Sequence, residues 1–228
     1  MRASLSDIRK VDVFEDIDES TLEKLCDVGE ILRLQKNASL YQDRQILNSV
    51  YFLLSGKVSL CKTNENGESK VIFLLSGGKI INQPLMRKNT SAIECWGFED
   101  STILRVGFEE FDKIMSQDYT LARNCMIFME YRIRSLYRQL KNSVTINIDK
   151  KLAAKLYRLA SEYGKVSDKE GFTYIDVPLT NTYLSKMLGC QRESVSRAMK
   201  SLGSKSIVKT DGRKIYIDME KSKELFKA

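Results

Sequence analysis

The most constraining feature of this chain is the segment 180–202, which predicts two short amphipathic helices joined by a tight turn. Thr180 is a suitable N-cap for the first helix, and Gly189 can adopt the left-handed conformation that ends it. Within each helix, apolar residues recur at intervals of three and four and therefore share one face. These residues are Leu184, Met187 and Leu188 in the first helix and Val195, Met199 and Leu202 in the second.

The second helix presents a polar face made of Gln191, Arg192, Glu193, Ser196, Arg197 and Lys200. A short helix with Arg and Glu in its first turn, one turn after another helix, suits insertion into the major groove of DNA. Glu193 and Arg197 are four residues apart and are neighbours on this face. The alternative is an ordinary surface ion pair on a helix hairpin, which is a common unit of protein structure.

Two strands are predicted after these helices, at residues 206–210 and 213–217, around a turn at Asp211-Gly212. Asp-Gly favours a two-residue hairpin turn, because both positions of such a turn need positive φ. A hairpin directly after a pair of short helices predicts a winged helix. Its basic tip is suited to DNA phosphates, which fix register without reading sequence. The residues of this tip are Lys209, Arg213 and Lys214.

The positive charge of the chain lies in the same region. The 228 residues carry a net charge of +7. Residues 141–228 hold 18 Lys and Arg against 10 Asp and Glu, whereas residues 1–140 hold 19 against 20. A basic half beside a nearly neutral half indicates that the basic half meets a polyanion. Chance variation in surface lysines is the alternative.

Composition excludes several other classes of protein. The chain is 43% hydrophobic and has no apolar segment of membrane-spanning length. No apolar signal-peptide core is evident at the N-terminus, so a cytoplasmic location is expected. The sequence contains no His, which excludes His-ligated haem, His-based zinc sites and His acid–base catalysis. No phosphate loop or nucleophile–base pair is evident either, and an enzyme is not expected.

The five cysteines are widely separated, at positions 26, 61, 95, 125 and 190. This spacing predicts neither a disulfide framework nor an iron–sulfur cluster, and we expect no bound metal or other resident cofactor. Cys190, in the turn between the two short helices, is the thiol whose oxidation would most affect DNA binding. Its alternative role is that of a small buried apolar residue, which is the usual role of a free cysteine.

The first half of the chain predicts a β-rich domain. Short helices are expected at residues 6–10 and 18–28. From 31 to 107, short runs of β-branched and aromatic residues alternate with turn residues, a pattern typical of an antiparallel barrel or sandwich. Asn66-Gly67 predicts a hairpin between strands at residues 58–63 and 70–75.

A long helix is predicted at residues 117–143. Its apolar residues are spaced alternately by four and three, which is the seam along which two helices pair. The seam consists of Ala122, Met126, Met129, Ile133, Leu136 and Leu140. A second apolar stripe, suited to packing on the β-domain, consists of Leu121, Cys125 and Phe128. Two stripes favour a dimerisation helix, and the alternative is a helix buried within one monomer.

The helical pattern breaks at residues 145–149, which we interpret as a domain boundary and hinge. Asp149 is the expected N-cap of a helix at 150–163, and residues 164–176 predict a polar loop or a small hairpin. The expected division is residues 1–116 for a β-domain, 117–146 for the long helix and hinge, and 147–228 for a winged-helix domain.

Residues 189–202 resemble the recognition motif of bacterial regulators related to the cyclic-AMP receptor protein and the fumarate–nitrate reduction regulator. Residues 51–60 and the Gly77-Gly78 turn resemble the β-roll of the sensor domain in that family. The resemblance implies an α+β protein with an N-terminal antiparallel β-roll, a jelly roll of the cyclic-nucleotide-binding type. It further implies a long dimerisation helix, a C-terminal winged helix-turn-helix, a palindromic double-stranded DNA operator and RNA polymerase as a candidate partner.

The resemblance also locates a candidate effector site. Where cyclic-AMP receptors carry Gly-Glu and Arg-Ser pairs, this chain has Asn82-Gln83 and Thr90-Ser91, so the arginine fork for a cyclic phosphate is missing. Cyclic AMP is therefore not expected, and the effector is an unidentified small molecule. Arg87 or Lys88 could replace the lost cation, or could lie on an exposed turn. The candidate effector residues are Asn82, Gln83, Thr90, Ser91, Arg132, Leu136 and Tyr137.

The leading hypothesis is a homodimeric transcription regulator. Arg192 and Arg197 would each read a guanine and Glu193 a cytosine, in a half-site similar to TGTGA or TTGA. The candidate DNA-binding residues are Thr180, Gln191, Arg192, Glu193, Ser196, Arg197, Lys200, Arg213 and Lys214. The alternative is a small-molecule sensor whose basic C-terminal domain binds DNA without specificity or binds a protein.

Overall fold

Strands with alternating apolar residues build the first half of the chain into two antiparallel sheets. The computed structural model describes residues 3–84, 89–141 and 147–227. It divides the chain into two compact units, residues 1–137 and 138–228. All strand pairs among these described residues are antiparallel.

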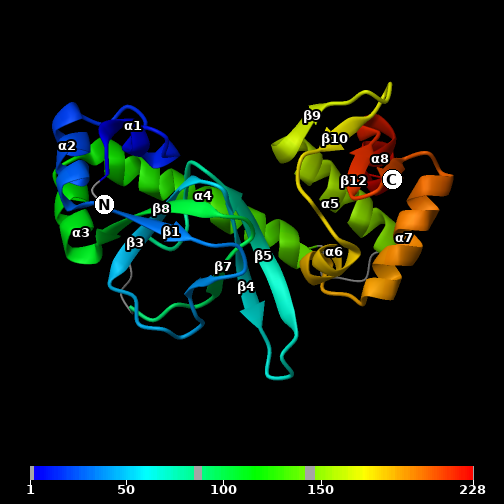
Figure 1. Ribbon diagram of the computed structural model, residues 1–228, viewed down its shortest axis with the longest axis horizontal. Helices are drawn as coiled ribbons and strands as arrows, with labels where there is room; N and C mark the ends of the chain where they lie inside the picture. Colours follow the sequence, from blue (N-terminus) through cyan, green and yellow to red (C-terminus); the bar gives the residue numbers. More distant parts are fainter. Residues whose placement is uncertain (1–2, 85–88, 142–146, 228) are drawn as a thin grey trace. The chain divides into compact units, whose positions relative to one another are not determined.

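The described residues of the first unit form two four-stranded sheets (Figure 1). The order in one is β1-β8-β3-β6, with β1 at Glu30–Leu34, β8 at Ser101–Gly107, β3 at Ser49–Ser55 and β6 at Lys79–Ile80. The order in the other is β2-β7-β4-β5, with β2 at Ser39–Tyr41, β7 at Glu94–Gly97, β4 at Lys57–Thr63 and β5 at Ser69–Ser76. Trp96, the only tryptophan of the chain, lies on β7 opposite Ser59 of β4.

Strand β3 shows how the sheets form two cores. Successive side chains of a strand point to opposite faces. Leu53 packs in a cluster with residues of the second sheet, including Val58 and Leu60. Phe52 packs in another cluster with the helices of this unit, including Phe111. The predicted β-roll is thus confirmed, and it is covered by helices on the face that Phe52 joins.

Three short helices belong to this covering layer. They are α1 at Leu5–Ile8, α2 at Glu19–Val28 and α3 at Phe108–Met115, with a short 3-10 turn at Asp12–Phe14. The first two agree with the predicted helices to within a few residues. The third was not predicted. It directly follows β8, and it buries Phe111, Ile114 and Met115.

The long helix α4 spans Tyr119–Lys141, close to the predicted range, of which residues 142–143 lie outside the described part of the chain. Leu121 and Cys125 are buried in the core and Phe128 packs against it, so the predicted inner stripe is confirmed. Along the predicted seam, Ala122 and Met129 are half-buried. Its exposed residues are Met126, Ile133, Leu136 and Leu140.

Within residues 147–227, the second unit contains four helices and a four-stranded sheet (Figure 1). The helices are α5 at Ile148–Tyr163, α6 at Asn181–Leu188, α7 at Arg192–Ser204 and α8 at Met219–Lys227. The order of the sheet is β11-β12-β10-β9, with β11 at Val208–Asp211, β12 at Lys214–Ile217, β10 at Thr173–Ile175 and β9 at Gly164–Val166. Strands β9 and β10 confirm the small-hairpin interpretation of residues 164–176.

Two local features of this unit differ from the predictions. The N-cap of α5 is Asn147, whose Oδ1 accepts a hydrogen bond from the Asp149 N–H at 2.8 Å, so Asp149 lies inside the first turn. Helix α8 was not predicted. Its Ser222 is fully buried and donates to the Ala153 carbonyl of α5, while Phe226 packs edge-on against Tyr157.

Both predicted hairpins exist, but their turns are displaced from the expected positions. In the wing, Asp211 pairs with Lys214, so the two turn residues are Gly212 and Arg213. Only Gly212 has positive φ, at 55°. In the β4–β5 hairpin the turn is a longer loop, in which the Asn64 side chain accepts from the Glu68 N–H at 2.9 Å. The prediction that both residues of Asp211-Gly212 have positive φ was therefore wrong.

The predicted boundary at residues 145–149 lies partly outside the described residues, and the expected three-part division remains a prediction. Within residues 3–84, 89–141 and 147–227, no helix is both long enough and apolar enough to cross a lipid bilayer.

Asp118 caps the long helix and ties it to α2. Its carboxylate accepts hydrogen bonds from the Leu121 N–H at 3.0 Å, the Thr21 hydroxyl at 2.8 Å and the Asp18 N–H at 3.3 Å. Burial alone would raise the pKa of Asp118, but these bonds outweigh it and lower the pKa below its ordinary value. The ionised carboxylate is therefore the form that stabilises the fold.

We expect Asp118→Asn to lower the free energy of unfolding by about 1–2 kcal/mol at neutral pH. Because folding lowers this pKa, the contribution is complete above about pH 4 and is lost as the pH falls through the folded-state value. Urea unfolding at a series of pH values measures the difference. Exposed Asp168→Asn is the control, and an effect of Asp118→Asn that does not change with pH would contradict the assignment.

Candidate nucleic-acid interface and sensor site

The turn between α6 and α7 is fixed by local hydrogen bonds. The Thr180 hydroxyl accepts from the Tyr183 N–H at 3.1 Å and begins α6, as the sequence predicted. Gly189 ends the helix in the left-handed conformation, with φ at 67°, and its N–H donates to the Ser185 carbonyl at 2.8 Å. These two ends set the direction in which α7 starts.

Helix α7 buries one face and exposes the other. Its buried residues are Val195, Ala198 and Leu202. Met199, predicted as part of the inward stripe, is half-buried, and Ala198 lies in the core instead. The polar residues of the opposite face are exposed except Ser196, which is half-buried. The exposed ones are Gln191, Arg192, Glu193, Arg197 and Lys200, together with Thr180 before α6.

Asp149 of α5 anchors the far end of α7. Its carboxylate accepts a hydrogen bond from the Ser201 hydroxyl at 2.5 Å and forms an ion pair with Lys205 at 3.5 Å. These contacts lie at the C-terminal end of α7 and do not involve the first turn of the helix. Sequence reasoning missed this role, since the partners lie more than 50 residues apart along the chain.

The sheet of this unit carries lysines over aromatic rings. Lys209 Nζ lies 4.1 Å from the centre of the Phe172 ring, Lys169 Nζ lies 4.1 Å from that of Tyr216, and Lys214 Nζ lies 5.8 Å from that of Tyr174. Such contacts position the ammonium groups of Lys209 and Lys214 without neutralising their charge, whereas Lys169 also forms an ion pair with Asp211 at 3.7 Å. Lys209, Lys214 and the turn residue Arg213 are exposed, so the wing presents three cations to its surroundings.

In the first unit, the predicted effector residues do not form one site. Asn82 is buried, and its amide is fully engaged. Its Oδ1 accepts from the Tyr51 N–H and its Nδ2 donates to the Ser49 carbonyl, both at 2.9 Å. Asn82 thus joins the segment after β6 to strand β3, which is a structural role.

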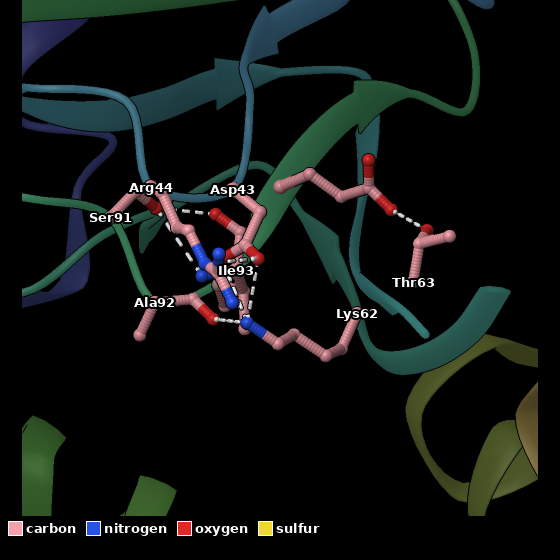
Figure 2. Close-up of polar contacts among 8 residues, drawn as sticks. Asp43, Arg44, Lys62, Thr63, Ser91, Ala92 and Ile93 are labelled. Atoms are coloured by element: carbon pink, nitrogen blue, oxygen red, sulfur yellow. Dashed lines mark hydrogen bonds and ion pairs between the residues drawn. The ribbon is translucent and has the colours of Figure 1, made fainter. Parts of the chain in front are cut away.

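Ser91 lies in a network of hydrogen bonds within the protein (Figure 2). The Ser91 carbonyl accepts from the Arg44 N–H at 2.9 Å, and the Ser91 hydroxyl donates to the Ile93 carbonyl. Lys62 Nζ lies between the Asp43 carboxylate at 2.8 Å and the Ala92 carbonyl at 2.9 Å. Thr90 itself is exposed. This segment is therefore held by its own contacts.

The remaining predicted effector residues are dispersed. Gln83 is half-buried, and Leu136 and Tyr137 are exposed on α4. Arg87 and Lys88 lie outside the described residues. Arg132 differs from the rest because its guanidinium is buried against the carbonyls that follow β6, with Nη2 donating to Ile81 at 3.0 Å.

The cysteines are poor candidates for redox sensing or metal binding. All five are thiols outside any disulfide, and burial raises the pKa of the Cys190 thiol, which disfavours the reactive thiolate. Cys190 therefore fits the interpretation as a small half-buried residue. Among the residues that the structure describes, no cluster of three or more Cys, Asp or Glu side chains could hold a metal ion.

Gly189→Ala tests the left-handed turn that ends α6 and sets the direction of α7. Because an L-residue is strained at positive φ, we expect a loss of about 1–2 kcal/mol in the free energy of unfolding. Gly203→Ala is the control, since Gly203 lies inside α7 with ordinary space for a methyl group, and we expect it to be neutral or stabilising. Equal losses in the two variants, measured by urea unfolding, would contradict the role of the turn.

Comparisons with known proteins agree with both halves of this geometry. Residues 31–118 match the model of the cyclic nucleotide-binding domain, and residues 150–221 match the model of the Crp-like helix-turn-helix domain. A cAMP-activated global transcriptional regulator from Pasteurella multocida is 19% identical over 87% of this chain and 95% of its own length. An anaerobic regulatory protein from Bacillus subtilis is 21% identical over 92% of this chain and 85% of its own length.

Among solved structures, a mutant of CooA from Carboxydothermus hydrogenoformans superposes with a TM-score of 0.78. It is 19% identical and covers 95% of each chain, which shows the same fold. The matched families are regulators and not enzymes. The chain therefore belongs to the superfamily of the cyclic-AMP receptor protein and the fumarate–nitrate reduction regulator, and is a transcription regulator with a sensor domain of the cyclic-nucleotide-binding type and a helix-turn-helix DNA-binding domain.

Proposed function

We propose that this regulator acts in the cytoplasm as a homodimer that binds a palindromic DNA operator and responds to a small molecule other than cyclic AMP. The observation that carries the proposal is the exposed face at the start of α7, where Arg192 and Glu193 of the first turn and Arg197 of the second lie outward while the other end of the helix is anchored. RNA polymerase is a candidate partner of the DNA-bound form.

The chemistry of this face suits base recognition. Arg192 and Arg197 can each donate two hydrogen bonds to guanine O6 and N7, and Glu193 can accept from cytosine N4. Gln191, Ser196 and Lys200 flank these residues, and Thr180 lies at the start of α6. Arg213 and Lys214 of the wing are suited to phosphates, which fix the register of α7 in the groove.

The exposed seam of α4 supports a homodimer. Met126 is 58% exposed and Leu140 is 69% exposed, which is unusual for large apolar side chains on a helix. Between them, Met129 and Ile133 line an apolar groove of about 650 Å³ together with Tyr137. A second copy of α4 would cover this seam by the knobs-into-holes packing that its spacing predicts.

An effector other than cyclic AMP fits the residues of the sensor domain. A cyclic phosphate needs a fixed cation or a cluster of amide donors. At the corresponding positions this chain has Thr90, which is exposed, and Ser91, which is engaged internally. We further propose that the effector sets the orientation of the DNA-binding domain through a hinge at residues 145–149.

Arg192→Ala tests base recognition. Because a good bidentate contact is worth about 1–3 kcal/mol, we expect affinity for the selected operator to fall about 5- to 150-fold and specificity to relax at one base pair. Selection of bound DNA from a random pool, followed by titration of the selected sequence, measures both. Lys214→Ala should instead weaken all sequences about equally.

If the random pool yields no preferred sequence, or if Arg192→Ala weakens random DNA as much as the selected DNA, the proposal of specific recognition is wrong. The alternative of a sensor whose basic domain binds DNA without specificity would then be favoured.

Ile133→Glu tests the dimer seam. A carboxylate on both copies would lie in an apolar interface, so we expect the dimer dissociation constant to rise at least about 10-fold. Tyr131→Glu is the matched control, because Tyr131 is an exposed aromatic residue on the face of α4 opposite the seam. Sedimentation at a series of concentrations measures the constants, and equal effects of the two substitutions would contradict dimerisation by this face.

A further inference from the structure

Arg132 is a buried cation whose hydrogen bonding is incomplete. Its side chain comes from α4, and the residue is 9% exposed. Nη2 donates to the carbonyls of Ile81 at 3.0 Å and Ile80 at 3.4 Å, whereas Nη1 has no acceptor among the residues that the structure describes. A buried donor without an acceptor is costly, and more so on a charged group.

Within the described residues, no acidic side chain pairs with this charge. The titratable side chains that act on Arg132 are Tyr41 and Cys95. Burial raises the pKa of Tyr41 well above its ordinary value and also raises that of Cys95, so both are neutral at physiological pH. Burial lowers the pKa of Arg132 only to about 10, so the guanidinium stays charged.

Tyr41 supplies a second unpartnered polar atom in the same interior. It lies at the end of β2, is 2% exposed and stacks on Tyr51. Its hydroxyl has no hydrogen-bond partner within the described ranges. Buried tyrosine hydroxyls usually have a partner. Tyr41 packs in the same core cluster as Ile81, whose carbonyl Arg132 bonds, and it acts electrostatically on Arg132, so the two unsatisfied donors belong to one region of the interior.

The surroundings of these donors are apolar. The guanidinium lies over the rings of Phe128 at 4.8 Å and Phe73 at 5.1 Å. Ile81 and Cys95 are both fully buried. The Ile81 carbonyl accepts a hydrogen bond from Arg132, and Cys95 acts on Arg132 electrostatically. An occupant of this site would thus meet one positive charge, one phenolic hydroxyl and aromatic or aliphatic walls.

We propose that Arg132 and Tyr41 form the receptor for a small organic monoanion of the carboxylate class, which is the effector of the sensor domain. This proposal rests on the proposed effector-responsive function. One cation is balanced by one negative charge, whereas a dianion would leave excess charge buried. A carboxylate has two oxygens, which can accept from the two N–H groups of Nη1 and from the Tyr41 hydroxyl.

The position of Arg132 gives such an anion a route to regulation. Arg132 bonds the backbone that follows β6, and the next residue, Ile133, belongs to the exposed seam of α4. An anion that neutralises Arg132 removes the penalty of its burial and so favours the arrangement in which α4 is held against the sheet. Occupancy would then stabilise the seam on which dimerisation depends.

The test uses the purified full-length chain, without DNA, at constant ionic strength. Acetate, butyrate and benzoate are the probes, benzamide is the uncharged analogue of benzoate, and cyclic AMP is a phosphodiester with the same charge. We expect the carboxylates to raise the melting temperature of the native chain, measured by thermal unfolding, and benzamide and cyclic AMP to leave it unchanged.

Variants assign the effect to the two side chains. We expect Arg132→Gln to weaken benzoate binding at least about 10-fold and Tyr41→Phe to weaken it about 2- to 10-fold. Arg123→Gln, which removes an exposed charge from the same helix, should bind as the native chain does. Tyr41→Phe deletes an unpaired hydroxyl, so its stability without ligand should be equal or higher, which keeps the test valid if Arg132→Gln folds poorly.

The proposal is overturned if no carboxylate stabilises the native chain, if benzamide acts as strongly as benzoate, or if only cyclic AMP acts. It is also overturned if the native chain, Arg132→Gln and Tyr41→Phe all respond equally. Operator binding by the same proteins, measured separately, distinguishes the two proposals. Sequence-specific DNA binding in a chain that binds no anion would reject the receptor and retain the regulator.

Discussion

The structure depends on how α4 distributes its apolar side chains. Leu121 and Cys125 are buried in the core between the helix and the β-roll, and they fix which side of α4 faces the sheets. The remaining apolar residues are too many for that face, so a second stripe is left in contact with solvent. Burial of exposed apolar surface is the main driving force for association. One helix thus connects the interior of the sensor domain to the surface available to a partner.

The DNA-binding domain follows a related division of labour between its two ends. Asp149 and the apolar stripe of α7 hold the helix by its C-terminal part, and the charged residues of the first turn, Arg192 and Glu193, are exposed. The wing reaches a similar result by other means, because the ammonium groups of Lys209 and Lys214 lie over the rings of Phe172 and Tyr174 while both lysines stay exposed. Cations are therefore positioned without being neutralised, as binding to a polyanion requires.

The sequence patterns predicted the features that depend on interactions between residues close together in the chain. Spacing and caps located α6, α7 and the two stripes of α4, because helix periodicity is recorded in neighbouring residues. Features that depend on distant partners were missed. Asn82 was expected to contact an effector, but the backbone of β3 takes its amide. The wing turn moved by one residue because pairing of Asp211 with Lys214 keeps Ile215 and Ile217 buried. The residues beside Arg132 along the chain gave no sign that its side chain is buried or that Nη1 lacks an acceptor among the described residues, since arginine is normally a surface residue.

The location of the single tryptophan has a practical consequence. Trp96 lies on β7, directly after Cys95, one of the two side chains that act electrostatically on Arg132. The residue is half-buried, and β7 is one of the two inner strands of the second sheet. Since the winged-helix unit has no tryptophan, the intrinsic fluorescence of the whole protein at indole-selective excitation originates in the sensor domain. The fluorescence of Trp96 therefore reports on the sensor domain without an added label. The DNA-binding unit contributes no tryptophan signal of its own.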